Sequence, residues 1–299
     1  MTSASSRVAS MAFFSVITVI FCQDACGVQV YPSARPTIDL SGSGNGVNLG
    51  SIAYHPGFGL YYGSHIGSRD YSAHVWNAQG TEVQTISRLG IDVRSLNFNP
   101  GTGDVEVISF DALNSGGLYT LGLDEAGRMT GTNPLVRGPL SGLNGRQTMP
   151  AYNAASDVFY SRGLGETVHI VNRRDGQLAG TIQLDLNAAG GGSLQSQTVG
   201  FDPVHGALIT VDTANERALV HDLNGTFLGA SALPTGLPLE LSYNMGYANG
   251  QLFVTTAERS FTYRGFQILV PEPTAAGIVA IATMTLLSRC RRQWSTRAA

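Results

Sequence analysis

The sequence predicts an all-β fold made of repeated blades, a β-propeller, and three observations lead to this prediction. Five segments, each with an aromatic residue, a turn and an apolar strand, recur at spacings of 44, 54, 49 and 46 residues. Such a period is typical of one propeller blade. Only 13% of the residues are charged and 37 are glycine, which favours short strands joined by tight turns over solvated helices.

The first turn of each repeat follows its aromatic residue. These residues are Tyr54, Phe98, Tyr152, Phe201 and Tyr247. In three repeats a proline stands two places after the aromatic residue and a glycine five places after it. Proline presets φ for a turn, and glycine accepts the positive φ at which the chain reverses. The third repeat has Ala154 and Asp157 at these places, and the fifth shortens the turn to Asn249 and Gly250.

A second turn in the first four repeats opens with Asn or Asp and closes with Gly. The opening residues are Asn77, Asp124, Asn172 and Asp222. Side chains of Asn and Asp bond to nearby backbone in such turns. Each repeat is therefore expected to hold four antiparallel strands, and neighbouring blades must cover its two faces.

The fifth repeat has three of its four expected strands before Val270, so one strand is missing. Residues 36–40 resemble residues 181–184, the last strand of the third repeat, so we expect this N-terminal segment to complete the fifth blade. Such pairing closes the ring and leaves no open sheet edge. The repeats predict five blades; a sixth would need a degenerate blade within residues 135–148 or 186–197.

One repeat also has a sequence resemblance to a known module. Residues 211–229 read VDTANERALVHDLNGTFLG. Their pattern of Asp212, Asn215 and Arg217, followed by Asp222 and Gly225, resembles the NHL-type propeller repeat. The resemblance implies the fold class; such propellers mostly bind, although a few related ones are metal-dependent hydrolases or lyases.

The first 27 residues have the pattern of a secretory signal peptide. Arg7 supplies the positive charge, residues 8–21 are apolar, and Ala25 and Gly27 are small residues suited to a cleavage site. The alternative is an N-terminal membrane anchor that is retained. Residues 28–269 then form the exported domain.

Residues 270–299 have the pattern of a C-terminal membrane segment. Pro271 and Pro273 end the preceding structure, and residues 274–288 form an uncharged run. As a helix this run would be about 22 Å long, against a hydrocarbon core of about 30 Å. The arginines that follow favour a transmembrane helix with its C-terminal end in the cytoplasm.

This tail resembles the PEP-CTERM sorting signal. The resemblance rests on Val270, Pro271, Glu272 and Pro273, on the apolar run, and on Arg289, Arg291 and Arg292. It implies an exosortase-type membrane transpeptidase as partner, cleavage near the motif, and delivery of the domain to the cell surface or extracellular matrix. Such proteins often accompany exopolysaccharide production.

Charge and cysteine content exclude several classes of function. The chain has no lysine, which removes Schiff-base chemistry. Residues 28–273 carry 13 arginines against 20 acidic residues, a formal charge of −7, so a nucleic acid is not an expected partner. The three cysteines, Cys22, Cys26 and Cys290, lie in the terminal segments, so the domain has no disulfide framework and no cysteine-based metal site.

No catalytic motif is present, and a Ser-His-Asp grouping is not recognisable. Four acidic residues follow the second strand of their repeats: Asp70, Asp111, Asp212 and Glu258. They are either Ca²⁺ ligands at a channel mouth or turn-forming and solvating carboxylates. Four aromatic residues either stack on sugar rings or pack in the core: Tyr61, Tyr62, Tyr71 and Trp76. The glycine-rich residues 41–46 and 190–192 are expected to be loops.

These observations predict an exported, membrane-tethered propeller that binds polysaccharide or another surface protein. No cofactor is expected, except Ca²⁺ if the four acidic residues are metal ligands. The alternative is a metal-dependent hydrolase or lyase acting at the channel mouth. Clustered acidic residues there would favour the enzyme, whereas a mouth lined by apolar and small residues would favour the binding protein. A structural matrix component without a specific ligand is a third alternative.

Overall fold

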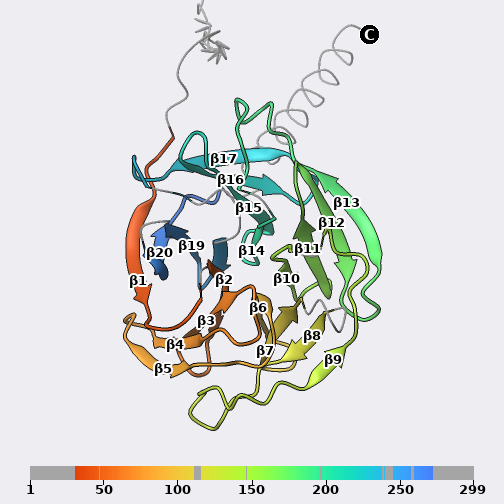
Figure 1. The fold of residues 1–299 in the computed structure, drawn as a ribbon. Helices are drawn as coiled ribbons and strands as arrows, with labels where there is room; N and C mark the ends of the chain where they lie inside the picture. Colours follow the sequence, from red (N-terminus) through yellow and green to blue (C-terminus); the bar gives the residue numbers. More distant parts are fainter. Residues whose placement is uncertain are drawn as a thin grey trace, which may run out of the picture. The chain divides into compact units, whose positions relative to one another are not determined.

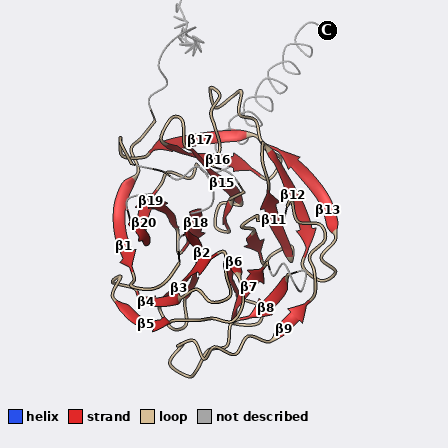
Figure 2. Ribbon diagram, viewed as in Figure 1, coloured by secondary structure: helices blue, strands red, loops and turns tan. Residues whose placement is uncertain are grey.

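The computed structural model of the chain describes residues 31–46, 48–110, 116–145, 147–195, 197–237, 239, 245–256 and 259–271. Its twenty strands form five four-stranded antiparallel sheets, arranged as the blades of a propeller (Figures 1 and 2). None of the described residues is helical, and none belongs to a helix long and apolar enough to cross a membrane. The predicted signal peptide and the predicted membrane segment, residues 274–288, lie outside the described residues.

Four blades are continuous in sequence and run from the axis outwards. Blade 1 comprises β2 (Asn48–His55), β3 (Leu60–Ile66), β4 (Ala73–Asn77) and β5 (Glu82–Ile86). Blade 2 comprises β6 (Val93–Asn99), β7 (Asp104–Ser109), β8 (Gly117–Thr120) and β9 (Leu135–Arg137). Blade 3 comprises β10 (Ala151–Asn153), β11 (Val158–Arg162), β12 (Thr167–Asn172) and β13 (Leu178–Gln183). Blade 4 comprises β14 (Gly200–Asp202), β15 (Ala207–Asp212), β16 (Arg217–Asp222) and β17 (Phe227–Ala232).

Blade 5 joins the two ends of the ring. It consists of β18 (Met245–Ala248), β19 (Gln251–Thr256), β20 (Arg259–Gln267) and, as its outer strand, β1 (Arg35–Ser41). β1 pairs antiparallel with β20, with Leu40 opposite Tyr263, and Leu40 is fully buried. The predicted closure by residues 36–40 is therefore confirmed. The five-blade count is confirmed as well: Leu135 belongs to the outer strand of blade 2, and the described residues between 186 and 197 contribute no strand to any of the five sheets.

The aromatic turns have the predicted geometry. φ is positive at Gly59, Gly103, Gly206 and, in the third repeat, Asp157. Asn249 and Gly250 both have positive φ, as a two-residue hairpin turn requires.

The residue directly after each of the first four aromatic residues caps its turn. These capping residues are His55, Asn99, Asn153 and Asp202, and each accepts the backbone N–H two residues further on, at 2.9–3.1 Å. This Asx-type turn was not predicted from the sequence.

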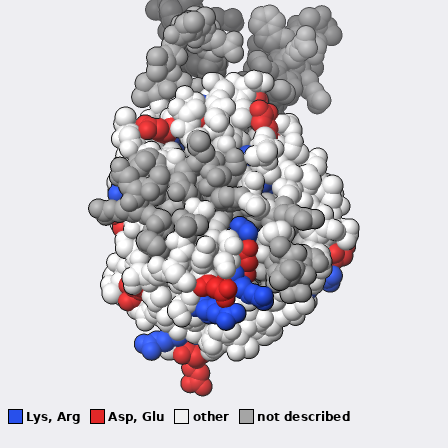
Figure 3. Space-filling model, viewed as in Figure 1, with Lys and Arg blue, Asp and Glu red and all other residues white. Residues whose placement is uncertain are grey.

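The hydrophobic core lies between the blades. Five of its clusters each bridge one pair of neighbouring blades, so the apolar faces of each sheet are covered by its neighbours. Tyr61, Tyr62 and Trp76 belong to these clusters and are almost wholly buried, so core packing is the correct alternative for them. Tyr71 is half-buried in the β3–β4 loop. On the face seen in Figure 3 the described surface is mostly uncharged, with acidic and basic groups side by side.

Candidate functional site

The aromatic residues that open the five repeats meet at the axis of the ring. The first strands of neighbouring blades pack on one another, and they and their turns line a cavity of about 370 Å³. We call its five aromatic side chains the aromatic girdle: Tyr54, Phe98, Tyr152, Phe201 and Tyr247. In the sequence these residues served only as landmarks of the repeat. Their equivalent place on the innermost strand of each blade was the signal that they would converge.

The girdle rings are held in place by aromatic neighbours. Ring centroids lie 4.7 Å apart for Tyr54 and Tyr61, and 5.2 Å apart for Tyr152 and Phe159. Phe98 packs on His55 of the preceding blade, at 4.7 Å. Because these neighbours are themselves buried in the core, the rings are preorganised rather than free to collapse into the cavity.

Two girdle tyrosines donate their phenolic protons to carboxylates. The Tyr152 hydroxyl donates to Asp157 Oδ1 at 3.0 Å, and the Tyr247 hydroxyl donates to Asp202. Burial, together with the hydrogen bond to Asp157, raises the pKa of Tyr152 to about 12; burial and the charge of Asp202 raise the pKa of Tyr247. Both phenols therefore stay protonated near neutral pH, and their oxygens are left as hydrogen-bond acceptors.

Of the lining residues that the structure describes, Asp202 is the one that is charged. It is 2% exposed. His205 Nδ1 lies 2.6 Å from Asp202 Oδ2, and the Val204 N–H donates to Oδ1 at 2.9 Å. The part of the lining that the structure describes holds no arginine, and it combines aromatic side chains and acceptor oxygens with one carboxylate.

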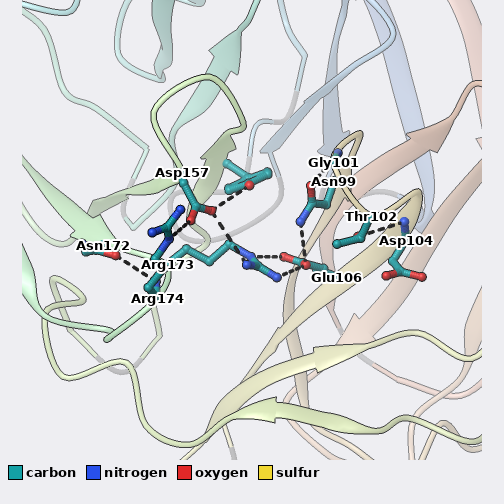
Figure 4. A network of polar contacts seen from close by, with 10 residues as sticks. Asn99, Gly101, Thr102, Asp104, Glu106, Asp157, Asn172, Arg173 and Arg174 are labelled. Carbon is teal, nitrogen blue, oxygen red and sulfur yellow. Dashed lines mark hydrogen bonds and ion pairs between the residues drawn. The ribbon is translucent and has the colours of Figure 1, made fainter.

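A polar network links the girdle to the interface of blades 2 and 3 (Figure 4). Beyond Tyr152, Asp157 lies 3.8 Å from the Arg173 guanidinium and accepts a hydrogen bond from Arg174. Arg173 in turn donates to Glu106, which also accepts from the Asn99 side chain at 2.9 Å. The hydrogen bond to Glu106 raises the pKa of Arg173, despite partial burial. Because Asn99 also caps the turn after Phe98, the network connects two adjacent girdle positions.

Two of the four predicted metal candidates are described, and they lie at the opposite end of the blades, where the second strands end. Asp70 is exposed in the β3–β4 loop and pairs with Arg88. Asp212 ends β15 and is wholly buried. Asp111 and Glu258 lie outside the described residues. Among the residues that the structure describes, no three His, Cys, Asp or Glu side chains gather closely enough to hold a metal ion.

Hydrogen bonds explain why the Asp212 carboxylate is buried. Its two oxygens accept five N–H groups: the backbone amides of Ser193, Ala214 and Asn215, the Asn215 side chain, and Arg217 Nε. Burial raises the pKa of Asp212, but these hydrogen bonds outweigh it and the pKa is lowered. The carboxylate therefore joins the β15–β16 turn to the glycine-rich residues 190–192, where the Gly191 carbonyl accepts from Arg217.

A second buried cluster lies in blade 1. Ser72 Oγ is 3.2 Å from His74 Nε2, and His74 Nδ1 is 2.6 Å from Glu82 Oε1, the order of a Ser-His-acid relay. This Ser-His-acid grouping was not predicted from the sequence. Ser72 is wholly buried, however, and its hydroxyl and amide both donate to the Asn45 carbonyl. In this arrangement the cluster anchors the glycine-rich residues 41–46, of which Ser41 ends β1 and residues 42–46 form the predicted loop.

The start of the predicted sorting motif is part of the folded domain. Val270 packs against the core between blades 4 and 5, and Pro271 lies against Gly229 of β17. The Leu269 N–H donates to the Ser231 hydroxyl at 2.8 Å. Glu272, Pro273, Arg289, Arg291 and Arg292 lie outside the described residues.

The comparison with solved structures supports the fold. A crystal structure of the glutaminyl cyclase of Myxococcus xanthus superposes with a TM-score of 0.53, covering 81% of this chain and 99% of that chain at 14% sequence identity. At this identity the likeness concerns the fold alone. No protein-family model matches the sequence, and no curated protein matches it either.

Proposed function

We propose that this protein is an exported binding module of the cell envelope or extracellular matrix, and that its ligand binds at the aromatic girdle. One observation carries the proposal: five aromatic side chains from five blades surround one cavity of about 370 Å³. That volume and lining are typical of sites for small molecules or for one segment of a polymer. The described lining of this cavity is apolar and aromatic with one carboxylate, which favours binding over metal chemistry at this end of the ring.

Polysaccharide is the ligand class that best suits this lining. Sugar rings present C–H faces to aromatic side chains, and their hydroxyls donate to acceptor oxygens such as those of Tyr152 and Tyr247. The tail that resembles a PEP-CTERM signal supports the same setting, because such proteins often accompany exopolysaccharide production.

A glycan array probed with the purified full chain tests this proposal. The substitution Phe98→Leu removes one girdle ring while keeping an apolar side chain, and should weaken binding about tenfold. The matched control is Tyr71→Leu, which removes a half-buried ring at the opposite end of the blades. Equal binding by the two variants, or no glycan bound by the wild type, would contradict the proposal.

The sorting part of the proposal has a separate test. The substitution Glu272→Ala alters the motif just beyond the last described residue, Pro271. We expect the wild type, expressed with an exosortase-type transpeptidase, to lose its C-terminal tail, and the variant to keep it. Intact mass measurement of the envelope fraction distinguishes the two. Identical masses would argue against recognition of this motif.

A second candidate function is enzymatic. The crystal structure that shares this fold is that of a glutaminyl cyclase, and Asp202 of the cavity has two further proton-transferring groups as partners, His205 and Tyr247. In that reaction the α-amine of an N-terminal glutamine attacks its own side-chain amide carbon, the C–N bond breaks, and ammonia leaves. Asp202 would take the amine proton and return it to the departing nitrogen.

Incubation with peptides that begin with glutamine tests this candidate. Cyclisation would appear as release of ammonia and the matching loss of peptide mass, and it should disappear in Asp202→Asn. Absence of turnover in the wild type, under conditions where the glycan array shows binding, would exclude the cyclase and leave the binding module.

A further inference from the structure

We infer that the ligand of the aromatic girdle is a saccharide that carries a free, protonated amino group. The inference rests on the proposed function, which needs only a ligand at the girdle, and it names the chemistry of that ligand. Three features of the cavity carry it: the acceptor character of its tyrosines, the sign of its charge, and the arrangement of its rings.

The tyrosine hydroxyls select a ligand that donates hydrogen bonds. Tyr152 and Tyr247 lie on either side of Phe201 in the order of blades 3, 4 and 5, and each phenolic proton is already donated to a carboxylate. Their oxygens can only accept further hydrogen bonds. An ammonium group brings three N–H donors, whereas a ligand carboxylate would bring only acceptors and could not bond to these two tyrosine oxygens.

The charge of the cavity points to a cation. Among the described residues that line the cavity, Asp202 is the one charged side chain and none is an arginine. The carboxylate is a hydrogen-bond partner of the Tyr247 hydroxyl, so its charge makes that oxygen a stronger acceptor. A cation near the faces of several aromatic rings is stabilised further by their quadrupoles. Uronic acids and other anions are disfavoured by the same features.

The ring arrangement favours a sugar over a peptide amine. The girdle has one aromatic side chain on each of five blades around a common axis. It therefore offers aromatic contacts from each blade to a broad, flat body with C–H groups on both faces. The slender side chain of lysine or a peptide N-terminus would contact few of these rings at once.

Isothermal titration of the full chain with matched oligosaccharides tests the inference. The probes are a β-1,4-linked tetramer of glucosamine, its fully N-acetylated counterpart, and a tetramer of galacturonate. We expect the free-amine tetramer to bind at least tenfold more tightly than the acetylated one, because acetylation removes the charge and two of the donors. The uronate tetramer should not bind.

Asp202→Asn is the informative variant, because Asn99 and Asn153 already cap the equivalent turns of blades 2 and 3. The variant therefore keeps the turn while losing the charge. It should reduce the preference for the free-amine tetramer about tenfold. Tyr247→Phe should also reduce the preference for the free-amine tetramer. Asp70→Asn removes an exposed carboxylate at the opposite end of the blades and serves as the charge-matched control.

The outcomes separate the inference from the proposed function. Equal or tighter binding of the acetylated tetramer overturns the inference and leaves a girdle-bound glycan standing. Binding of a lysine-rich or N-terminal peptide in place of both sugars overturns it in favour of a protein ligand. Binding that is unchanged in Phe98→Leu, for every probe, overturns the inference and the proposed function together.

Discussion

The Glu106 carboxylate of blade 2 is bonded to the Arg173 guanidinium of blade 3, with Arg173 Nε 2.9 Å from Glu106 Oε2 (Figure 4). Glu106 is 1% exposed, and the Asn99 amide donates to its other oxygen. A buried ion pair that is fully hydrogen-bonded holds its partners in one geometry. Through Asp157, this pair also fixes the hydroxyl of Tyr152 in the girdle.

Glu106→Ala should lower the free energy of unfolding by about 3 kcal/mol or more, because it leaves the Arg173 charge largely buried without its main partner. Urea unfolding of the purified full chain measures the loss. Asp70→Ala is the control: it breaks an ion pair with Arg88 in which both side chains are more than 60% exposed, so the change should stay below about 1 kcal/mol. Equal losses in the two variants would contradict a structural role for the interblade pair.

Gly44→Ala should destabilise the protein by about 1–3 kcal/mol, because a Cβ there would lie 2.1 Å from Ser72 Oγ and push residues 41–46 off the buried cluster. Gly138→Ala is the matched control, since a Cβ at that glycine meets no atom within 4 Å. Thermal unfolding compares the two variants. If Gly44→Ala is as stable as the control, the glycines of this loop are not required for close packing.

Asp212→Asn should destabilise the protein by about 2–3 kcal/mol, because it weakens the charge-assisted bond to Arg217 and turns one acceptor into a donor facing other donors. The loss should be the same in calcium and in a chelator, since five N–H groups already occupy this carboxylate. Differential scanning calorimetry under both conditions measures it. A loss seen only in calcium would instead support Asp212 as a calcium ligand.

Stability should fall as the pH drops from about 6.5 towards 4. Burial lowers the pKa of both His65 and His221 to about 4. Between these values the unfolded chain binds protons that the folded chain does not, so acid favours unfolding, by roughly 3 kcal/mol for each histidine at pH 4. Urea unfolding from pH 7.5 to 4.5 measures the slope.

His221→Gln should remove the contribution of one histidine to this dependence of stability on pH. The lowered pKa of Asp212 makes stability fall in the same direction, but it does so in both proteins and therefore cancels in the comparison. An unchanged slope in the variant would show that His221 is not neutral in the folded state.

Much of the fold could be predicted because the signals are local. The alternation of apolar strands with turns at Pro56 and Gly59, or at Asn77 and Gly80, depends on residues only a few places apart. The closing strand was predictable because the fifth repeat lacked one strand. The polar caps that follow the aromatic residues were not predicted. A histidine or asparagine at the end of a strand does not by itself indicate a cap, because that role depends on the hydrogen bonds that the side chain makes in the structure.

By itself, the sequence determined the repeat, the five blades and the residues that close the ring, since each depends on turn chemistry and strand pattern within about fifty residues. Only the tertiary structure decided that Tyr54 and Tyr247, 193 places apart, line one cavity, and that Glu106 meets Arg173 across a blade interface. The physical reason is that these contacts cross from one blade to another and depend on how the ring closes, whereas the repeat pattern specifies each blade separately.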